Sequence, residues 1–329
     1  MTRKISIIGE EWELKKPFVI SRSSRTKTST ILVSIEDGPH IGLGESVPNP
    51  RYEESITSSI KQIKMIEQEL ANGLDRGQLN KIMPAGAARN AVDCALWDLE
   101  AKQLGKDVGA ISGLEWPGET ETVQTISILS PKEMYEEAKA LANFAAIKVK
   151  LNAERVLERI AAVHSGAPGS KILVDANESW TIELLNHAAP ALAKLNVVMI
   201  EQPLHADKDE ALIDYQFALP LFADESCHST ADLPHLQNKY QGINIKLDKT
   251  GGLTGAILLE RLALKQGMRT MVGCMLGTSL GIAPAMFLAE RAQFVDIDAP
   301  ALLAKDREYG IEIDNGKVSE LDPRLWGGC

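Results

Sequence analysis

Between Glu121 and about residue 304, eight short β-rich runs alternate with helical segments. The runs are "TVQTISIL", "AIKVKL", "KILVDAN", "VVMIEQP", "PLFADES", "GINIKLD", "RTMVGC" and "QFVDIDA". Helical segments begin near Pro131, Ala153, Thr181, Ala206, Thr230, Leu253 and Ser279. Regular alternation of this kind favours an α/β fold with a parallel sheet. Eight strands within about 180 residues fit a TIM-type barrel of (β/α)7β form, with the last helix missing or altered.

An open, doubly wound sheet is the alternative arrangement for the same alternation. Its usual glycine-rich phosphate turn after the first strand is absent here, so the barrel is favoured over residues 120–304. Residues 1–119 predict an α+β capping domain. They contain two or three strands, including "RKISIIGEEWEL" and "STILVSIEDG", and helices over residues 53–73 and 85–105. Residues 305–329 are expected to return to this cap.

Composition and charge narrow the classes of partner. The chain has 329 residues and a formal net charge of -10, and no basic stretch offsets that charge. This argues against nucleic acid or an anionic membrane as a partner. No apolar run approaches the roughly 18 residues that a membrane span needs. The N-terminus alternates and carries charge, which indicates a first strand and not a signal peptide.

Cysteine usage indicates the compartment. Four scattered cysteines without a CxxC pair are typical of reduced thiols in a cytosol: Cys94, Cys227, Cys274 and Cys329. We therefore expect a cytoplasmic protein with a small-molecule substrate. A homo-oligomer is compatible with this composition.

Single carboxylates stand at the ends of three consecutive barrel strands. They are Asp175 in "ILVDAN", Glu201 in "VMIEQP" and Asp224 in "LFADES". Functional groups of such barrels lie at the C-terminal ends of the strands, so these three should meet at one mouth. Without a cation they would repel one another, and an all-oxygen ligand set suits Mg²⁺. The sequence predicts one Mg²⁺ per subunit, although any one of the carboxylates could instead cap a helix.

Lysines are expected to face the same mouth. Period-two alternation places Lys148 and Lys150 on the inward face of the second strand, and it places Lys246 and Asp248 on the inward face of the sixth. The second and sixth strands lie on opposite sides of an eight-stranded barrel. Lys150 and Lys246 should therefore face each other. Lys249, on the other face of its strand, is expected to be structural or solvated.

These lysines are candidates for acid and base chemistry. A nearby cation, a second lysine and burial all disfavour the ammonium form, so we expect a lowered pKa that suits a base. The alternative is that each lysine forms a structural ion pair.

"KVK", "DAN", "EQP", "ADES" and "NIKLDKTGG", in this order on successive strands, resemble the enolase superfamily and, more narrowly, its muconate-lactonizing subgroup. The resemblance covers essentially the whole chain. It implies Mg²⁺-assisted removal of a proton α to a carboxylate or carboxamide carbonyl, through an enediolate. The positions that match imply Asp175, Glu201 and Asp224 as metal ligands, Lys150 and Lys246 as acid and base, and Lys148 as the holder of the substrate carbonyl or carboxylate.

Two further stretches bear on the substrate. "FVDIDAP" places Asp296 and Asp298 on the inner face of the eighth strand, where two carboxylates suit a cationic group. This DxD resembles that of dipeptide epimerases, in which it binds the substrate ammonium; a helix cap or a lysine partner is the alternative. "FVISRSSRTKTST" is predicted to be a polar loop that carries Arg22 and Arg25. The superfamily loop at this place reads the substrate side chain, and Arg25 could pair with a second carboxylate, as in L-Ala-D/L-Glu epimerases.

By the same resemblance, Thr125 and Cys274 line the substrate cleft. No histidine stands beside Cys274 in the sequence, so it is interpreted as a wall and not as a nucleophile. The predicted function is epimerisation of L-Ala-L-Glu to L-Ala-D-Glu and back, and the resemblance implies a role in the turnover of cell-wall peptides. The alternatives are a cycloisomerase or lyase of the muconate cycloisomerase or o-succinylbenzoate synthase type, an N-acylamino acid racemase, and a metal-binding barrel without catalysis.

Overall fold

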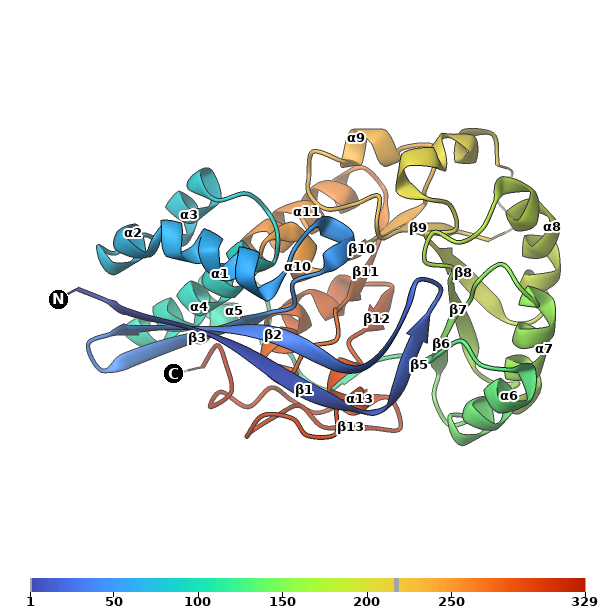
Figure 1. Ribbon diagram of the computed structural model, residues 1–329, viewed down its shortest axis with the longest axis horizontal. Coiled ribbons are helices and arrows are strands. Elements are labelled where there is room, and N and C mark those ends of the chain that lie inside the picture. The colour runs from blue at the N-terminus through green and yellow to red at the C-terminus, as the bar shows by residue number, and fades with distance from the viewer. Residues whose placement is uncertain (1, 216–218, 329) are drawn as a thin grey trace.

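The computed structural model describes residues 2–215 and 219–328, except for the side chain of residue 214. It contains a parallel barrel and a cap built on an antiparallel sheet (Figure 1). Both parts agree with the fold class that the sequence predicts.

The barrel has eight parallel strands hydrogen-bonded in chain order. The Val123 amide donates to the Val295 carbonyl at 3.0 Å and joins the first strand to the last. All eight predicted strands are confirmed: β5 (Gln124–Ile126), β6 (Ala146–Lys150), β7 (Lys171–Asp175), β8 (Val197–Glu201), β9 (Leu221–Ala223), β10 (Gly242–Ile245), β11 (Arg269–Gly273) and β12 (Phe294–Asp296).

Helical segments follow the first seven strands, as predicted. They are α6 (Pro131–Ala140), α7 (Val156–Gly166), α8 (Ile182–Ala193), the 3-10 helix η2 (Ala206–Asp214), α9 (Leu233–Leu236), α11 (Leu253–Lys265), and α12 (Ser279–Ile282) with η3 (Ala283–Arg291). After the eighth strand, the described chain has the short α13 (Ala299–Leu302) in the place of a full barrel helix, in agreement with the expected altered last helix. Between β10 and α11 the barrel also contains a short helix that was not predicted: α10 (Leu247–Thr250) begins almost directly after β10.

Period-two alternation separates the two faces of the barrel strands. A small apolar cluster comprises Val123, Leu173, Met199, Phe222 and Met271. Two residues beyond three members of this cluster, on the same inward face, stand Asp175, Glu201 and Asp224. The barrel interior therefore has an apolar floor with a layer of charged side chains above it, at the C-terminal ends of the strands.

The cap contains the antiparallel strands β1 (Lys4–Ile20), β2 (Ser23–Asp37) and β3 (His40–Ser46). Its helices are η1 (Pro50–Tyr52), α1 (Ile56–Met65), α2 (Glu67–Ala71), α3 (Arg76–Ile82), α4 (Ala87–Leu104) and α5 (Val108–Ser112). The predicted helix over 85–105 is confirmed as α4, whereas the predicted helix over 53–73 is split between α1 and α2. Strand β3 lies directly against α4. Only a glycine fits at position 44, because a Cβ atom there would come within 2.1 Å of the Ala91 carbonyl oxygen.

The predicted polar loop at residues 18–30 is wrong: all of these residues except Ser21 and Arg22, which form the turn, belong to strands β1 and β2. Phe18 pairs with Arg25 and Ile20 with Ser23, so the turn is tight and the strands continue almost to its tip. The apolar run Phe18 to Ile20 favours a strand, and the register irregularity falls between Glu13 and Phe18, next to a proline. Figure 1 shows this hairpin bending from the cap toward β5 and β6.

The C-terminal segment lies against the cap. Strands β13 (Ile313–Asp314) and β14 (Lys317–Val318) form a small sheet with β4 (Thr120–Glu121). Beyond them, the Trp326 indole donates to the Cys94 carbonyl at 3.1 Å, and the Gly327 amide donates to an Asp98 carboxylate oxygen at 2.7 Å. Both acceptors belong to α4 and fasten the chain end to it.

Two observations bear on membrane association and thiol chemistry. Over residues 2–215 and 219–328, no helix is long and apolar enough to cross a membrane. The described cysteines Cys94, Cys227 and Cys274 are free thiols. Cys329 lies outside the described residues.

Candidate active site

A cavity of about 100 Å³ lies between the barrel mouth and the cap. The cap contributes Phe18, Ile20, Arg22, Ser23, Arg25, Val47, Pro48, Asn49 and Tyr52. The barrel contributes Thr125, Lys150, Asn177, Asp224, Glu225, Lys246, Cys274, Met275, Leu276, Asp296, Asp298, Ala299 and Leu302. Most of the predicted site residues therefore meet in one place. Three of them are not in its lining and are buried in the barrel: Lys148, Asp175 and Glu201.

Lys150 and Lys246 line this cavity from opposite sides of the barrel. Lys150 is the last residue of β6 and Lys246 directly follows β10, four strands further around. The Lys150 ammonium donates to Asp175 Oδ2 at 2.5 Å, and the Lys246 ammonium donates to Asp224 Oδ2 at 2.6 Å. The Phe18 ring centroid lies 6.0 Å from Lys150 Nζ, so the cap hairpin covers this lysine.

The three strand-end carboxylates meet with ammonium groups between them. Lys148 Nζ lies 3.3 Å from Asp175 Oδ2 and 2.6 Å from Glu201 Oε2. Lys246 Nζ lies 4.0 Å from Glu201 Oε1 and 2.6 Å from Asp224 Oδ2. In this arrangement, the described acidic, histidine and cysteine side chains form no group of three or more that could hold a metal ion. Three buried carboxylates from adjacent strands nevertheless form an oxygen donor set of the kind that Mg²⁺ prefers.

The electrostatics of the lysines differ from the sequence-based expectation of a lowered pKa. Burial lowers the pKa of Lys246, but the carboxylates of Asp224 and Glu201 outweigh burial, and the net effect raises it. The pKa of Lys148 is likewise raised well above its usual range, because burial is outweighed by Asp296 and Glu201. That expectation assumed a cation beside the lysines and stays a prediction for the metal-bound protein; without a cation, the anionic neighbours of Lys246 dominate over burial and like charge.

The pKa values of two strand-end carboxylates, Asp224 and Glu201, are shifted in opposite directions. Burial raises the pKa of Asp224, yet Lys246 and Lys249 hold it well below its usual range. Burial and the Asp175 carboxylate together raise the pKa of Glu201. Asp224 is therefore the firmly ionised member of this pair.

Asp296 and Asp298 both line the cavity, and each already has a partner. Asp296 Oδ2 accepts from the Lys148 ammonium at 2.6 Å. Asp298 Oδ2 accepts from the Thr125 backbone amide at 2.7 Å and from the Gln124 side-chain amide at 3.0 Å. Burial, reinforced by the Asp296 carboxylate, raises the pKa of Asp298 to about 7. Among the described contacts, Asp296 has the lysine partner that the sequence left open as an alternative, and Asp298 does not.

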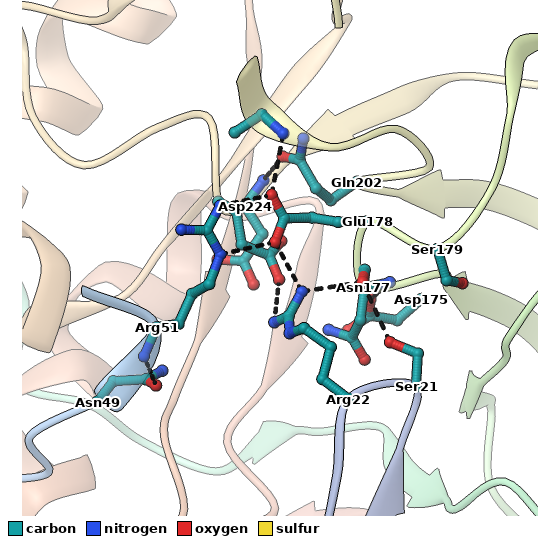
Figure 2. A network of polar contacts seen from close by, with 12 residues as sticks. Ser21, Arg22, Asn49, Arg51, Asp175, Asn177, Glu178, Ser179, Gln202 and Asp224 are labelled. Atoms are coloured by element: carbon teal, nitrogen blue, oxygen red, sulfur yellow. Dashed lines mark hydrogen bonds and ion pairs between the residues drawn. The ribbon is translucent and has the colours of Figure 1, made fainter. Parts of the chain in front are cut away.

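The two hairpin arginines differ in their contacts. Arg22 donates to Glu178 and Glu225, each at 2.7 Å, and Figure 2 shows its guanidinium turned toward Glu178. Arg25 lines the cavity and is paired with none of the described carboxylates. Arg25 is therefore the hairpin arginine that is available to a bound molecule.

Cys274 lies in the segment after β11 and is partly exposed to the cavity. Desolvation and the nearby acids Asp296 and Asp298 raise the pKa of its thiol well above the usual range. A neutral thiol is a poor nucleophile, which agrees with its interpretation as a wall.

Asp248 and Lys249 lie where α10 directs them, contrary to the alternation that the sequence suggested. The predicted inward position of Asp248 is wrong, because the strand ends at Ile245 and the chain turns into a helix after Lys246. Asp248 Oδ1 instead accepts from the Val47 amide at 2.8 Å, on the cap side.

Lys249 is buried, so the expectation of a solvated side chain is wrong and the structural alternative holds. Its ammonium donates to the Asp224 carbonyl at 2.5 Å, to Asp224 Oδ1 at 2.6 Å and to the Asn244 carbonyl at 3.0 Å. These contacts satisfy all three of its N–H groups. Lys249 therefore holds Asp224 in place.

Two amide side chains that the sequence analysis did not single out support the carboxylates. Gln202 Oε1 accepts from the backbone amides of Asp224 at 2.9 Å and Ser226 at 3.1 Å. Asn244 Nδ2 donates to Glu201 Oε1 at 2.7 Å. Gln202 directly follows Glu201 in "EQP", and Asn244 precedes Lys246 on the inward face. Their position beside the motif acids was the available signal.

Family models match both parts of the chain. Residues 2–113 match the N-terminal domain of the mandelate racemase / muconate lactonizing enzyme family, and residues 133–319 match the enolase C-terminal domain-like model. The chain is 46% identical over 302 residues to an N-acetyl-D-glutamate racemase from Pseudoalteromonas sp, covering 91% of this chain and 95% of that protein. It is 42% identical over 318 residues to the L-Ala-D/L-Glu epimerase of Escherichia coli (strain K12), covering 96% and 99%.

Solved structures agree in fold over the whole chain. A crystal structure of an Agrobacterium tumefaciens enolase family member with homology to dipeptide epimerases, with bound sodium and L-Ala-L-Glu and an ordered loop, superposes with a TM-score of 0.96. It is 42% identical, with 99% of this chain and 100% of that chain covered. A dipeptide epimerase from Enterococcus faecalis V583, complexed with Mg and L-Leu-L-Tyr, has a TM-score of 0.90 at 26% identity, with 97% of each chain covered. The chain therefore belongs to the mandelate racemase / muconate lactonizing enzyme family of the enolase superfamily.

Proposed function

We propose that the protein is a Mg²⁺-dependent dipeptide epimerase that interconverts L-Ala-L-Glu and L-Ala-D-Glu. One observation carries the proposal: Lys150 and Lys246 line a single cavity from opposite strands, together with Asp296 and Asp298. Relatives with 42% and 46% identity are named an epimerase and a racemase, and enzymes of this class invert a carbon centre.

The proton chemistry follows from the opposed lysines. The α-carbon of the second residue would lie between Lys150 and Lys246. A neutral lysine on one side takes the α-proton, so that a C–H bond breaks and an N–H bond forms. The ammonium on the other side then returns a proton to the opposite face, which inverts the configuration. The reverse reaction uses the same two residues with their roles exchanged.

The proposed ligands of Mg²⁺ are Asp175, Glu201 and Asp224, because they are buried oxygen donors from three adjacent strands. When bound, Mg²⁺ would stabilise the negative charge that develops on the substrate carboxylate as the α-proton leaves. Lys148 contacts two of these ligands, and we assign it to the same substrate carboxylate. A cation at these carboxylates would compete with the ammonium groups for the same oxygens.

The remaining groups of the substrate have candidate partners in the cavity lining. Asp298, with Asp296 beside it, would bind the free α-ammonium of the first residue. Arg25 would bind the side-chain carboxylate of the second residue, since no described carboxylate occupies its guanidinium. Thr125 and Cys274 would form the wall between these two ends.

A second candidate is an N-acetylglutamate racemase. The relative at 46% identity is named an N-acetyl-D-glutamate racemase. In this structure Asp296 is paired with Lys148, and Asp298 accepts from two neutral N–H groups. The two candidates use the same proton chemistry and differ in the group at the acidic pair, which is the α-ammonium of alanine in one and the uncharged methyl of the acetyl group in the other.

Incubation with Mg²⁺ in D₂O, followed by NMR and chiral analysis, tests both candidates. We expect deuterium at the α-carbon of glutamate and mixed L- and D-Glu products from L-Ala-L-Glu, with slow turnover of N-acetyl-L-Ala-L-Glu and N-acetyl-D-glutamate. Faster turnover of N-acetyl-D-glutamate would establish the second candidate. A new constitutional product would indicate a cycloisomerase or lyase, and absence of exchange with every compound would indicate a binding protein.

A further inference from the structure

One carboxylate at the barrel mouth connects two separate segments of the cap. Glu178 lies three residues beyond the end of β7, and its side chain is 3% exposed. It accepts two hydrogen bonds from Arg51, both at 2.8 Å, and one from Arg22 at 2.7 Å. The Ala206 amide donates to the same carboxylate at 2.9 Å. Figure 2 shows Glu178 between the two arginines, of which one belongs to the hairpin turn and the other to η1.

The backbone next to Glu178 also faces the hairpin turn. The Asn177 carbonyl accepts from Ser21 Oγ at 3.1 Å and from Arg22 Nη1 at 2.9 Å. Asn177 and Glu178 have φ values of 42° and 65°, in the left-handed region that residues with a side chain seldom adopt. The loop after β7 therefore adopts an uncommon conformation that presents a carbonyl and a carboxylate to the cap together.

These contacts distinguish the two hairpin arginines. Arg22 is bound on one side by Glu178 and on the other by Glu225, whose side chain is 2% exposed. Arg25 lies opposite Phe18 in the hairpin and lines the cavity, and it is paired with none of the described carboxylates. The position of Arg25 over the cavity thus depends on the hairpin, and the hairpin tip is fastened through Arg22.

We propose that Glu178 is a positioning residue for substrate selectivity. It clamps the hairpin turn and the η1 segment onto the barrel and thereby holds Arg25 over the cavity, without contacting the substrate itself. The selectivity role rests on the proposed function, in which Arg25 binds the side-chain carboxylate of the dipeptide. Guanidinium contacts to a buried carboxylate, bidentate from Arg51, are suited to this role because they are directional as well as strong.

Glu178→Gln is the appropriate variant, with Glu158→Gln as a matched control. Glutamine keeps the shape and an acceptor for the Ala206 amide, but it removes the charge that two guanidinium groups share. Glu158 on α7 makes an exposed ion pair with Arg155 at 2.7 Å, where loss of charge should have little effect. We expect the KM for L-Ala-L-Glu to rise roughly 10- to 100-fold in Glu178→Gln, with kcat within about 3-fold of the parent.

Selectivity is the decisive kinetic readout. The ratio of kcat/KM for L-Ala-L-Glu to that for L-Ala-L-Leu should fall in Glu178→Gln, because only the charged substrate needs Arg25. Glu158→Gln should keep the parent ratio. Retention of the parent ratio by Glu178→Gln would overturn the proposal, even if the hairpin were loosened.

Hydrogen exchange separates failure of the clamp from failure of the proposed function. Backbone amides of residues 18–25 should exchange faster in Glu178→Gln than in the parent, while Mg²⁺ affinity measured by calorimetry stays unchanged. Parent-like exchange would overturn the clamp whether or not a dipeptide is turned over. If the parent enzyme turned over no dipeptide, the proposed function and the selectivity role would both be wrong, and faster exchange would then support only the clamp.

A double-mutant cycle with Arg51→Gln adds a test of the pairing itself. Because Glu178 and Arg51 share two hydrogen bonds, the free energy of opening of residues 18–25 should fall less in the double variant than the sum of its decreases in the two single variants. Strict additivity of the changes in opening free energy, obtained from the exchange rates, would show that Arg51 acts through some other residue and would overturn its place in the clamp.

Discussion

The ammonium nitrogen of Lys148 lies 2.6 Å from Asp296 Oδ2, and this ion pair joins β6 to β12 across β5. Sequence reasoning assigned Lys148 to the substrate carboxylate and Asp296 to the substrate ammonium. In the structure each of them neutralises the other. Of Asp296 and Asp298, Asp298 is the one whose hydrogen-bond partners among the described residues are neutral N–H groups. The predictions on the ammonium site therefore centre on Asp298.

Asp298→Ala should impair recognition of a free amino terminus. We expect kcat/KM for L-Ala-L-Glu to fall about 30- to 1000-fold, because one partner of a partly desolvated charge pair is lost. Turnover of N-acetyl-L-Ala-L-Glu should change far less, since it carries no ammonium. Steady-state kinetics with both compounds measures the difference. An equal loss of kcat/KM for the two compounds would mean that Asp298 does not bind the substrate ammonium.

Replacement of either lysine should separate proton exchange from epimerisation. Lys150→Ala and Lys246→Ala should each stop net epimerisation, because one face of the α-carbon loses its acid or base. Each variant should still exchange the α-proton of the one epimer that faces its surviving lysine, which NMR in D₂O detects. Lys171→Ala, at the exposed start of β7, is the control and should behave as the parent. Epimerisation at the parent rate in either variant would exclude that lysine as a base.

Arg25→Ala should remove the preference for an acidic second residue. Arg25 is the hairpin arginine without a carboxylate partner among the described residues, so its loss should affect L-Ala-L-Glu and spare L-Ala-L-Leu. The ratio of the two kcat/KM values should fall roughly 10- to 100-fold, with unchanged Mg²⁺ affinity. Lys27→Ala, an exposed cation of the same strand, is the matched control. An unchanged ratio would assign the side-chain pocket to other residues.

Removal of metal should abolish activity, and Asp224 should be important for both metal binding and stability. We expect chelation to stop turnover and added Mg²⁺ to restore it. Asp224→Asn should weaken Mg²⁺ binding in calorimetry. It should also cost about 3–5 kcal/mol in unfolding free energy, because Lys246 and Lys249 lose their buried counter-ion. Exposed Asp207→Asn serves as the control. Full activity of the metal-free protein would contradict the metal assignment.

The stability of the cap–barrel contact should depend on pH through Asp248. Burial raises the pKa of Asp248 to about 7, above its ordinary value of about 4. Between these values only the folded state holds the proton, so stability falls as pH rises through this window and is constant above it. Asp248→Asn keeps an acceptor for the Val47 amide, and its neutral side chain avoids the free-energy cost of ionising a buried carboxyl group. It should be more stable than the parent by about 1–2 kcal/mol at pH 8 and not at pH 4.

Urea unfolding at several pH values, with EDTA present to remove metal binding as a variable, measures this difference. Exposed Asp207→Asn should follow the parent curve at every pH. If the free energy of unfolding changed with pH in the same way for the parent and Asp248→Asn, Asp248 would not titrate in this window.

Much of the fold and of the candidate site follows from local patterns. Alternation along each strand determines which side chains face inward, so Lys150 and the strand-end acids could be placed from sequence. Where the strand ends early, the same rule fails: helix α10 turns Asp248 to the cap and brings Lys249 to Asp224. The hairpin was misjudged because its polar residues resemble a loop, whereas cross-strand pairing keeps them extended.

The sequence by itself therefore determined the barrel, its order of strands and the set of charged groups at its mouth, because these depend on short-range periodicity and on chain order. Only the tertiary structure decided which charges pair. Lys148 with Asp296 and Glu178 with Arg22 are each separated by about 150 residues along the chain. Such partners depend on how the strands and the cap come together. Burial then makes the pairing strong, because an unpaired charge in the barrel mouth would cost far more than an exposed one.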